Sequence, residues 1–197
     1  MRIDFFKNLI FSGRGSSALF ALLKALDLKG SEVMLPVNVC EIIYPIVKNS
    51  GYLPCFYDVD SVSGNTNLNL IKSKFTNNQK VLLLVHNFGV PVEDIFEIKN
   101  WCKRNNVFLI EDVCNSLGAK YKGKYLGKIG DASILSFGYA KIIENNLGGG
   151  CFVKDKQLRD RTLKIVDEFD VYNDLHFQKN LHFQTLIQQK RKGQLND

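Results

Sequence analysis

The chain has 197 residues, of which 45% are hydrophobic and 11% aromatic, enough apolar material for one large folded domain and too much for global disorder. The formal net charge of +6 is spread along the sequence, so charge does not favour a nucleic-acid-binding protein. The five cysteines and three histidines show no paired or metal-ligating spacing, which argues for reduced thiols and against a metal site. Because no apolar run approaches membrane-spanning length, we expect a cytoplasmic protein without a membrane partner.

A glycine- and serine-rich turn precedes the first predicted helix. A short apolar segment at 9–11 leads into Gly13, Gly15, Ser16 and Ser17, and leucines at helical spacing predict a helix over 17–28. Free amides and hydroxyls at a helix start form a natural anion site, although a capped helix without a ligand is the alternative. The turn also matches the dinucleotide pattern G-x-G-x-x-A, but the preceding strand is weak and no acid closes the next strand.

Strand-like and helix-like segments then alternate with short gaps. We predict strands over 32–37, 53–58, 80–86 and 107–111, and helices over 40–48, 68–75 and 94–105. This alternation predicts an α/β three-layer sandwich with a mostly parallel sheet, in which ligands bind at the carboxyl ends of the strands. The sequence puts His86–Gly89, Glu111–Asp112 and Ser136 there.

Asp112 is the important acid of this set. It follows the apolar run 107–110, so it should end a central strand with its carboxylate near the ligand crevice. A carboxylate in that place can pair with a protonated pyridine nitrogen. From this segment alone, capping of the following turn is the simpler interpretation.

A lysine-rich segment, Lys120–Lys128, comes next and is typical of a solvated hairpin; contact with an anionic substrate is the second interpretation. The stretch from Ser136 to Gly150 then carries Lys141 and the three glycines Gly148 to Gly150. A desolvated lysine at the mouth of a strand can attack a carbonyl, Ser136 could hold a phosphate oxygen, and glycines let the backbone approach a flat ligand. A lysine linked to pyridoxal phosphate needs these parts, whereas a solvated loop lysine is the common alternative.

Taken together, these stretches resemble the DegT/DnrJ/StrS family of pyridoxal-phosphate-dependent aminotransferases, which mostly act on keto-sugar nucleotides. The resemblance implies the large domain of a fold-type I transferase. The matching stretches are collinear: Gly15–Leu19, Glu32–Pro36, Phe56–Asp60, Val85–Gly89, Glu111–Gly123, Gly127–Asp131 and Ser136–Lys141.

The resemblance implies a role for each site residue. Lys141 would form the Schiff base with pyridoxal 5′-phosphate and then move the substrate proton, Asp112 would hold the pyridine nitrogen, and Asn115 would face the phenolic oxygen. The phosphate would be bound at the helix start and by the strand-end serine: Gly15, Ser16, Ser17 and Ser136. The aromatic residue that usually stacks on the cofactor ring would align near Cys40, with Tyr44 as a substitute one helical turn later.

The resemblance covers residues 10–155, and family members are roughly twice as long as this chain. We therefore predict a cofactor-binding large domain over 1–155, no C-terminal small domain, and a polar helical extension over 156–197. The extension carries a six-residue repeat around His176 and His182 that is a poor metal motif.

Two functions follow from this resemblance. The first is transfer of an amino group, from glutamate, to a keto-sugar nucleotide for surface polysaccharide or related amino-sugar biosynthesis, by a homodimer. Lys141 favours aminotransfer over dehydration, because related sugar dehydratases carry histidine in its place. The second is a truncated or split, non-catalytic large-domain fragment that binds the cofactor or pairs with a complementing chain.

Overall fold

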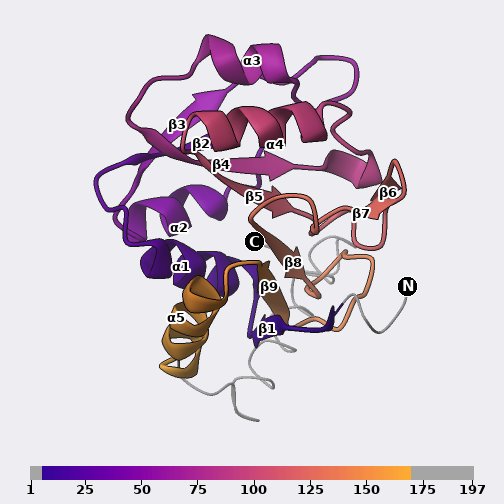
Figure 1. Cartoon of the computed structure of the whole chain (residues 1–197). Helices are drawn as coiled ribbons and strands as arrows, with labels where there is room; N and C mark the ends of the chain where they lie inside the picture. Colours follow the sequence, from indigo (N-terminus) through magenta and orange to yellow (C-terminus); the bar gives the residue numbers. More distant parts are fainter. Residues whose placement is uncertain (1–5, 170–197) are drawn as a thin grey trace, which may run out of the picture. The chain divides into compact units, whose positions relative to one another are not determined.

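The computed structural model describes residues 6–169, and the compact unit within it ends at Asp167 (Figure 1). Seven strands form one sheet in the order β1-β9-β8-β5-β4-β2-β3. β9 runs antiparallel to both of its neighbours, and the other six strands run parallel to one another. The bounds are β1 Leu9–Ser12, β2 Glu32–Pro36, β3 Leu53–Tyr57, β4 Gln79–Val85, β5 Phe108–Asp112, β8 Ala132–Ser136 and β9 Gly149–Val153.

Helices cover both faces of this sheet (Figure 1). Successive strand residues point to opposite faces, so Val81 and Leu83 of β4 join one core, whereas Leu82 and Leu84 join the other. The first core includes residues of α1, α2 and α5, and the second includes residues of α3 and α4. The helix bounds are α1 Gly15–Leu26, α2 Ile43–Asn49, α3 Leu68–Ser73, α4 Ile95–Arg104 and α5 Lys156–Asp167. The predicted three-layer α/β sandwich is confirmed.

The second helix begins later than the sequence pattern suggests. Residues 40–42 form a turn in which the amide of Ile43 donates to the carbonyl of Cys40 at 2.9 Å, and α2 starts at Ile43. Pro45 therefore lies in the first turn of the helix, where its missing amide donor is not needed. Cys40 belongs to the connection between β2 and α2 as a result.

The carboxyl ends of the parallel strands share one edge of the sheet. β8 and β5 lie side by side there, with Asp112 paired in register with Ile134. β4 is the other neighbour of β5, and Val85 pairs with Asp112. The segments after β1, β4, β5 and β8 thus meet at this edge, as the sequence analysis anticipated for a parallel sheet.

Two further segments lie outside the main sheet. The lysine-rich segment forms the predicted hairpin, from β6 (Lys120–Tyr121) and β7 (Lys124–Tyr125), and Lys120 lies over the ring of Tyr125 at 4.4 Å. α5 packs against the first core through Leu158, and the Arg161 guanidinium donates to the carbonyl of Ala25 at 3.2 Å. The repeat around His176 and His182 lies outside the described residues. Within residues 6–169, no helix is long and apolar enough to cross a membrane.

Candidate functional site

Lys141 lies in an irregular segment between β8 and β9, at the carboxyl edge of the sheet. Ala140, just before it, has a left-handed backbone with φ of 58°, which is uncommon for a residue with a side chain. The half-buried Lys141 donates a hydrogen bond from its amine to Oδ1 of Asn115 at 2.9 Å. The structure thus brings together Lys141 and Asn115, two of the predicted site residues. The backbone strain lies at Ala140, next to the lysine, and strained residues are common at functional sites.

Asp112 is the last residue of β5, and only 7% of its surface is exposed. Its Oδ1 accepts a hydrogen bond from the amide of Cys114 at 2.9 Å. The Cys114 thiol also lies within hydrogen-bonding reach of this carboxylate. Asp112 therefore caps the following turn, as the simpler interpretation of the sequence has it.

The pKa of the Cys114 thiol depends on its burial and on three of the residues considered for the site. Burial raises the pKa of the Cys114 thiol well above its ordinary value, and the Asp112 carboxylate raises it further. The Lys141 ammonium lowers the same pKa, and the thiol of Cys40 also contributes a small increase. The pKa of the partly buried Cys114 thus reflects Asp112, Lys141 and Cys40, the cysteine that the sequence aligned with the cofactor ring.

The start of α1 lies against the end of β8. A Cβ added to Gly15 would come within 2.8 Å of the Leu135 carbonyl oxygen and 3.3 Å of Cβ of Ser136, so only glycine permits this approach. The first hydrogen bond of the helix runs from the amide of Ala18 to the carbonyl of Arg14 at 3.1 Å. The amides of Ser16 and Ser17 precede it without an acceptor inside the helix, beside Ser136, whereas the bridge between Arg14 and Gly148 engages the amide of Gly15.

Ser136, the last residue of β8, accepts a hydrogen bond at its hydroxyl oxygen from the amide of Gly138 at 3.2 Å. Asp112 pairs with Ile134, two residues before Ser136 on the neighbouring strand, and adjacent strands lie about 4.8 Å apart. The helix start, Ser136 and Asp112 therefore line one continuous edge. This is the arrangement that a molecule with a phosphate at one end and a ring nitrogen at the other requires.

The two residues considered for the cofactor ring, Cys40 and Tyr44, lie in different surroundings. Tyr44 stacks on Phe56 of the edge strand β3, with ring centroids 6.2 Å apart. This contact engages the Tyr44 ring with the edge of the sheet. Cys40 is exposed and lies in the turn after β2, close enough to influence Cys114.

A buried pair, His86 and Glu111, supports the same edge and was not given this role from the sequence. Both side chains are fully buried, and His86 Nε2 lies 3.3 Å from Glu111 Oε2. The amide of Val92 donates to His86 Nδ1 at 3.1 Å, so Nε2 carries the proton and donates to Glu111. Glu111 also accepts from the amides of Gly127 at 2.8 Å, Ile129 at 2.7 Å and Gly130. Glu111 thereby ties the turn before β8 to the end of β5.

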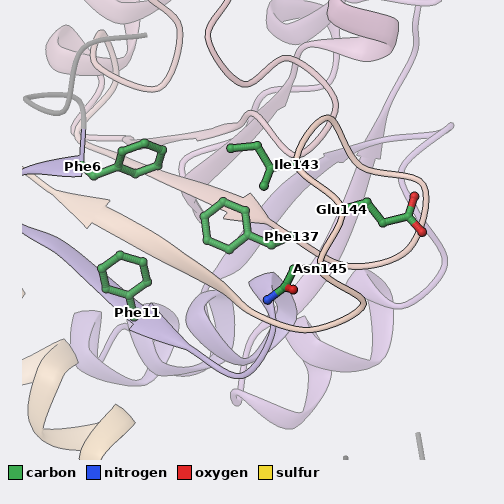
Figure 2. Close-up of a pocket in the computed structure, with 6 residues that line it drawn as sticks. All are labelled: Phe6, Phe11, Phe137, Ile143, Glu144 and Asn145. Carbon is green, nitrogen blue, oxygen red and sulfur yellow. The ribbon is translucent and has the colours of Figure 1, made fainter. Parts of the chain in front are cut away.

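An apolar hollow of about 380 Å³ adjoins the Lys141 segment (Figure 2). Figure 2 shows the rings of Phe6, Phe11 and Phe137 grouped near Ile143, with Glu144 and Asn145 completing the lining. Phe11 on the edge strand β1 is 62% exposed. The hollow was not predicted, because its aromatic rings come from segments far apart in the sequence.

The comparisons with known proteins agree with this geometry. The model of the DegT/DnrJ/EryC1/StrS aminotransferase family matches residues 7–191. The chain belongs to this family. The resemblance stated from the sequence motifs is therefore confirmed, and the family match extends beyond the stretch that carried it.

Among curated proteins, the chain is 37% identical over 150 residues to a GDP-perosamine synthase of Escherichia coli O157:H7, covering 76% of this chain and 41% of that protein. Among solved structures, an aminotransferase from Psychrobacter cryohalolentis is 31% identical with a TM-score of 0.76, covering 81% of this chain and 42% of the other. The E. coli GDP-4-keto-6-deoxy-D-mannose-3-dehydratase, solved with hydrated pyridoxal phosphate, is 25% identical with a TM-score of 0.72 and covers 79% and 43%. The chain thus spans about two fifths of the length of these relatives.

Proposed function

We propose that this chain is the cofactor-binding part of a pyridoxal-phosphate-dependent aminotransferase that transfers an amino group from glutamate to a keto-sugar nucleotide. Surface polysaccharide or related amino-sugar biosynthesis would use the product. One observation carries the proposal: the amine of Lys141, held at 2.9 Å by Asn115, lies at the strand edge where β5 ends in the nearly buried carboxylate of Asp112. The relatives named above, a GDP-perosamine synthase and an aminotransferase, support the reaction class.

The residues at the edge fit pyridoxal 5′-phosphate. The amides of Ser16 and Ser17, with the hydroxyl of Ser136, would hold the phosphate, because a helix N-terminus favours an anion, and Gly15 would let the helix start approach the end of β8. The Asp112 carboxylate would accept from the protonated ring nitrogen, and Asn115 would face the ring oxygen. When bound, the cofactor supplies an electron-withdrawing ring that stabilises negative charge on the carbon beside the amino group.

The chain's own residues would divide the remaining work. Lys141 would anchor the cofactor covalently and, once released, carry a proton to and from the substrate carbon as general acid and base. Asn115 would orient the Lys141 amine through the hydrogen bond described above. The Asp112 carboxylate, 7% exposed, would keep the ring nitrogen protonated, since an ionised acid in a dry site strengthens that hydrogen bond.

A second candidate function follows from the length of the relatives. This chain spans 41% of the E. coli GDP-perosamine synthase and 42% of the Psychrobacter aminotransferase. In this alternative the chain binds the cofactor but turns over substrate only when a complementing chain supplies the remaining part of the site.

A spectroscopic titration tests both candidates. Adding pyridoxal phosphate to the wild-type chain should produce a new visible absorbance band that borohydride removes, and Lys141→Ala should show no such band. Glutamate should then bleach the band if the chain completes the first half of an aminotransfer. A band that glutamate leaves unchanged supports the second candidate. A band of equal strength in Lys141→Ala would overturn both.

The proposal also includes a cytoplasmic homodimer, as the resemblance implied. Light scattering coupled to size-exclusion chromatography should give about twice the chain mass of 22.4 kDa. A monomer at the highest attainable concentration would contradict the homodimer.

A further inference from the structure

Phe88, in the turn after β4, has an unfavourable backbone conformation and an exposed side chain. Its backbone is left-handed, with φ of 55° and ψ of 25°, and 81% of its surface is exposed. A bulky aromatic residue in this region is a genuine outlier, because its Cβ crowds the backbone. Exposure also forfeits the burial that stabilises phenylalanine elsewhere in the chain. Strain and exposure together point to a role in binding rather than in folding.

Buried amides hold the turn around Phe88 in place. The amide of Asn87 donates to Oδ1 of Asn65 at 3.0 Å, and Nδ2 of Asn87 donates to the carbonyl of Gly64 at 3.0 Å. Nδ2 of Asn65 donates to the carbonyl of Val90 at 3.0 Å. Asn65 and Asn87 are only 4% and 7% exposed. These side chains over-determine the turn, so the aromatic ring is presented from a rigid base.

The same turn is fastened to the candidate site. The amide of His86 donates to the carbonyl of Asp112 at 3.2 Å. A Cβ added to Gly89 would lie 3.6 Å from the carbonyl oxygen of Asn115, whose side chain holds Lys141. Phe88 therefore lies at the rim of the site, one residue before a glycine that approaches Asn115.

Exposed apolar side chains also lie on the strand-end loops next to the turn that carries Phe88. Val37 follows β2 and is 53% exposed, Val62 follows β3 and is 93% exposed, and Val90 follows Phe88 and is 49% exposed. Asn38 connects two of these loops, because its Nδ2 donates to the carbonyl of Gly64 at 2.8 Å. A group of exposed apolar residues at a site rim marks a contact surface.

We propose that Phe88 stacks on the base of the nucleotide portion of the amino acceptor. The inference rests on the proposed function, in which the sugar carbonyl of the acceptor must reach Lys141. The nucleotide must then extend away from the lysine, toward the rim where Phe88 stands. A flat ring held rigidly in advance binds a base without an ordering penalty, and stacking on an aromatic side chain accepts any base.

Calorimetry with nucleoside diphosphates tests the proposal on the full chain. The probes are GDP, dTDP and UDP, with inorganic pyrophosphate as the base-free control. For the diphosphate that binds the wild type, Phe88→Ala should raise the dissociation constant by about 5- to 150-fold, which is the effect of removing one stacking aromatic side chain. Phe88→Trp should preserve binding, and pyrophosphate should bind Phe88→Ala and the wild type equally. Leu163→Ala, a matched change at an exposed apolar residue of α5 and outside this rim, should leave binding unchanged.

Three results would overturn the proposal. The first is failure of all three diphosphates to bind the wild type at millimolar concentration, and the second is equal binding by Phe88→Ala. The third is a change of oligomeric state in Phe88→Ala, measured by light scattering, with unchanged nucleotide binding; Phe88 would then belong to an interface between copies of the chain.

Two further measurements distinguish a loss of nucleotide binding from a loss of folding and from a failure of the proposed function. Phe88→Asn should unfold at the same temperature as the wild type or higher, because asparagine adopts the left-handed conformation readily. The covalent reaction of Lys141 with pyridoxal phosphate should be unchanged in Phe88→Ala. If the wild type binds GDP through Phe88 but forms no adduct at Lys141, the proposed function fails and the nucleotide contact stands.

Discussion

Glu111 and Asp112 are adjacent acids at the end of one strand, but their carboxylates accept different numbers of hydrogen bonds from the backbone. Glu111 is fully buried and accepts hydrogen bonds from three backbone amides and from His86. Asp112 points to the other side of the sheet and accepts from one backbone amide, that of Cys114. A fully satisfied carboxylate has no capacity left for a ligand, whereas a partly satisfied one at the edge of a site does. The number of donors that each acid receives therefore separates the structural acid from the site acid.

Removal of the structural acid should have the largest effect. Glu111→Ala should lower the free energy of unfolding by about 3–5 kcal/mol, because it leaves buried amide donors and His86 without an acceptor. Glu111→Gln keeps one acceptor oxygen and should lose less. Urea denaturation followed by circular dichroism measures both. A loss below about 1 kcal/mol in Glu111→Ala would show that the amides find other partners.

A change at the junction of α1 and β9 should come next. A Cβ at Gly149 would lie 2.3 Å from the amide nitrogen of Gly15 and 2.8 Å from the carbonyl oxygen of Leu135, so backbone must move. Gly149→Ala should destabilise the protein by about 3 kcal/mol and weaken pyridoxal phosphate binding, since the displaced helix start belongs to the phosphate subsite. Gly13→Ala, which meets nothing within 4 Å, is the matched control and should change neither property.

Asp112→Asn should separate binding from stability. Asparagine retains an oxygen to accept from the amide of Cys114, so the free energy of unfolding should change by less than about 1 kcal/mol. Loss of the charge facing the ring nitrogen should weaken pyridoxal phosphate binding by about 10- to 150-fold, measured by absorbance titration. Asp58→Asn, at an exposed acid after β3 that pairs with Lys74 at 3.8 Å, should leave cofactor binding unchanged. Equal effects of the two variants would contradict the special role of Asp112.

Stability should also fall at alkaline pH. Burial raises the pKa of Cys102 and of Cys151 to about 12 from the ordinary thiol value of 9.0. Protonated thiols in the folded state contribute stability that is fully present below pH 9.0 and is lost as the pH rises toward about 12. Urea denaturation at pH about 8 and about 10.5 should show this loss, and Cys102→Ala with Cys151→Ala should make the slope shallower. An unchanged slope in the double variant would assign the loss to other groups.

The smallest effect is expected at the strained residue beside the lysine. Ala140→Gly removes a left-handed alanine, which costs about 1–2 kcal/mol, but it adds freedom to the unfolded chain. The free energy of unfolding should therefore rise by at most about 1 kcal/mol. If Ala140→Gly instead destabilises the chain by more than that, the left-handed turn does not store strain.

Much of the fold could be predicted from the sequence because its strands are apolar on both faces. The predicted strand over 107–111 matches β5 to within one residue, and the alternation of strands and helices predicted the parallel sheet correctly. The sequence did not predict that β9 runs antiparallel between β1 and β8, because that pairing depends on glycines whose backbones touch residues far away, such as Gly150 against Ile10. The start of α2 was placed three residues early, because the turn at 40–42 satisfies its backbone locally.

The residues of the candidate site that lie in the family's collinear motifs could be named from the sequence. Lys141 and Asn115 were named from the sequence and are hydrogen-bonded in the structure. The role of Glu111 was not, because its donors come from residues 16 to 19 positions later, in a turn with no acid-binding signature. The conformation of Phe88 was also hidden, since the amides that hold it belong to three separate loops.

The most direct test of the account is to map where pyridoxal phosphate reacts. The full chain is mixed with cofactor, reduced with borohydride and analysed by peptide mass spectrometry. Lys128 is the internal competitor, because burial lowers its pKa to about 8 and makes its amine reactive without a built site. We expect Lys141 to be labelled in preference to Lys128 at low cofactor concentration, and Asp112→Asn to remove this preference. Labelling of Lys128 with Lys141 unmodified would contradict it.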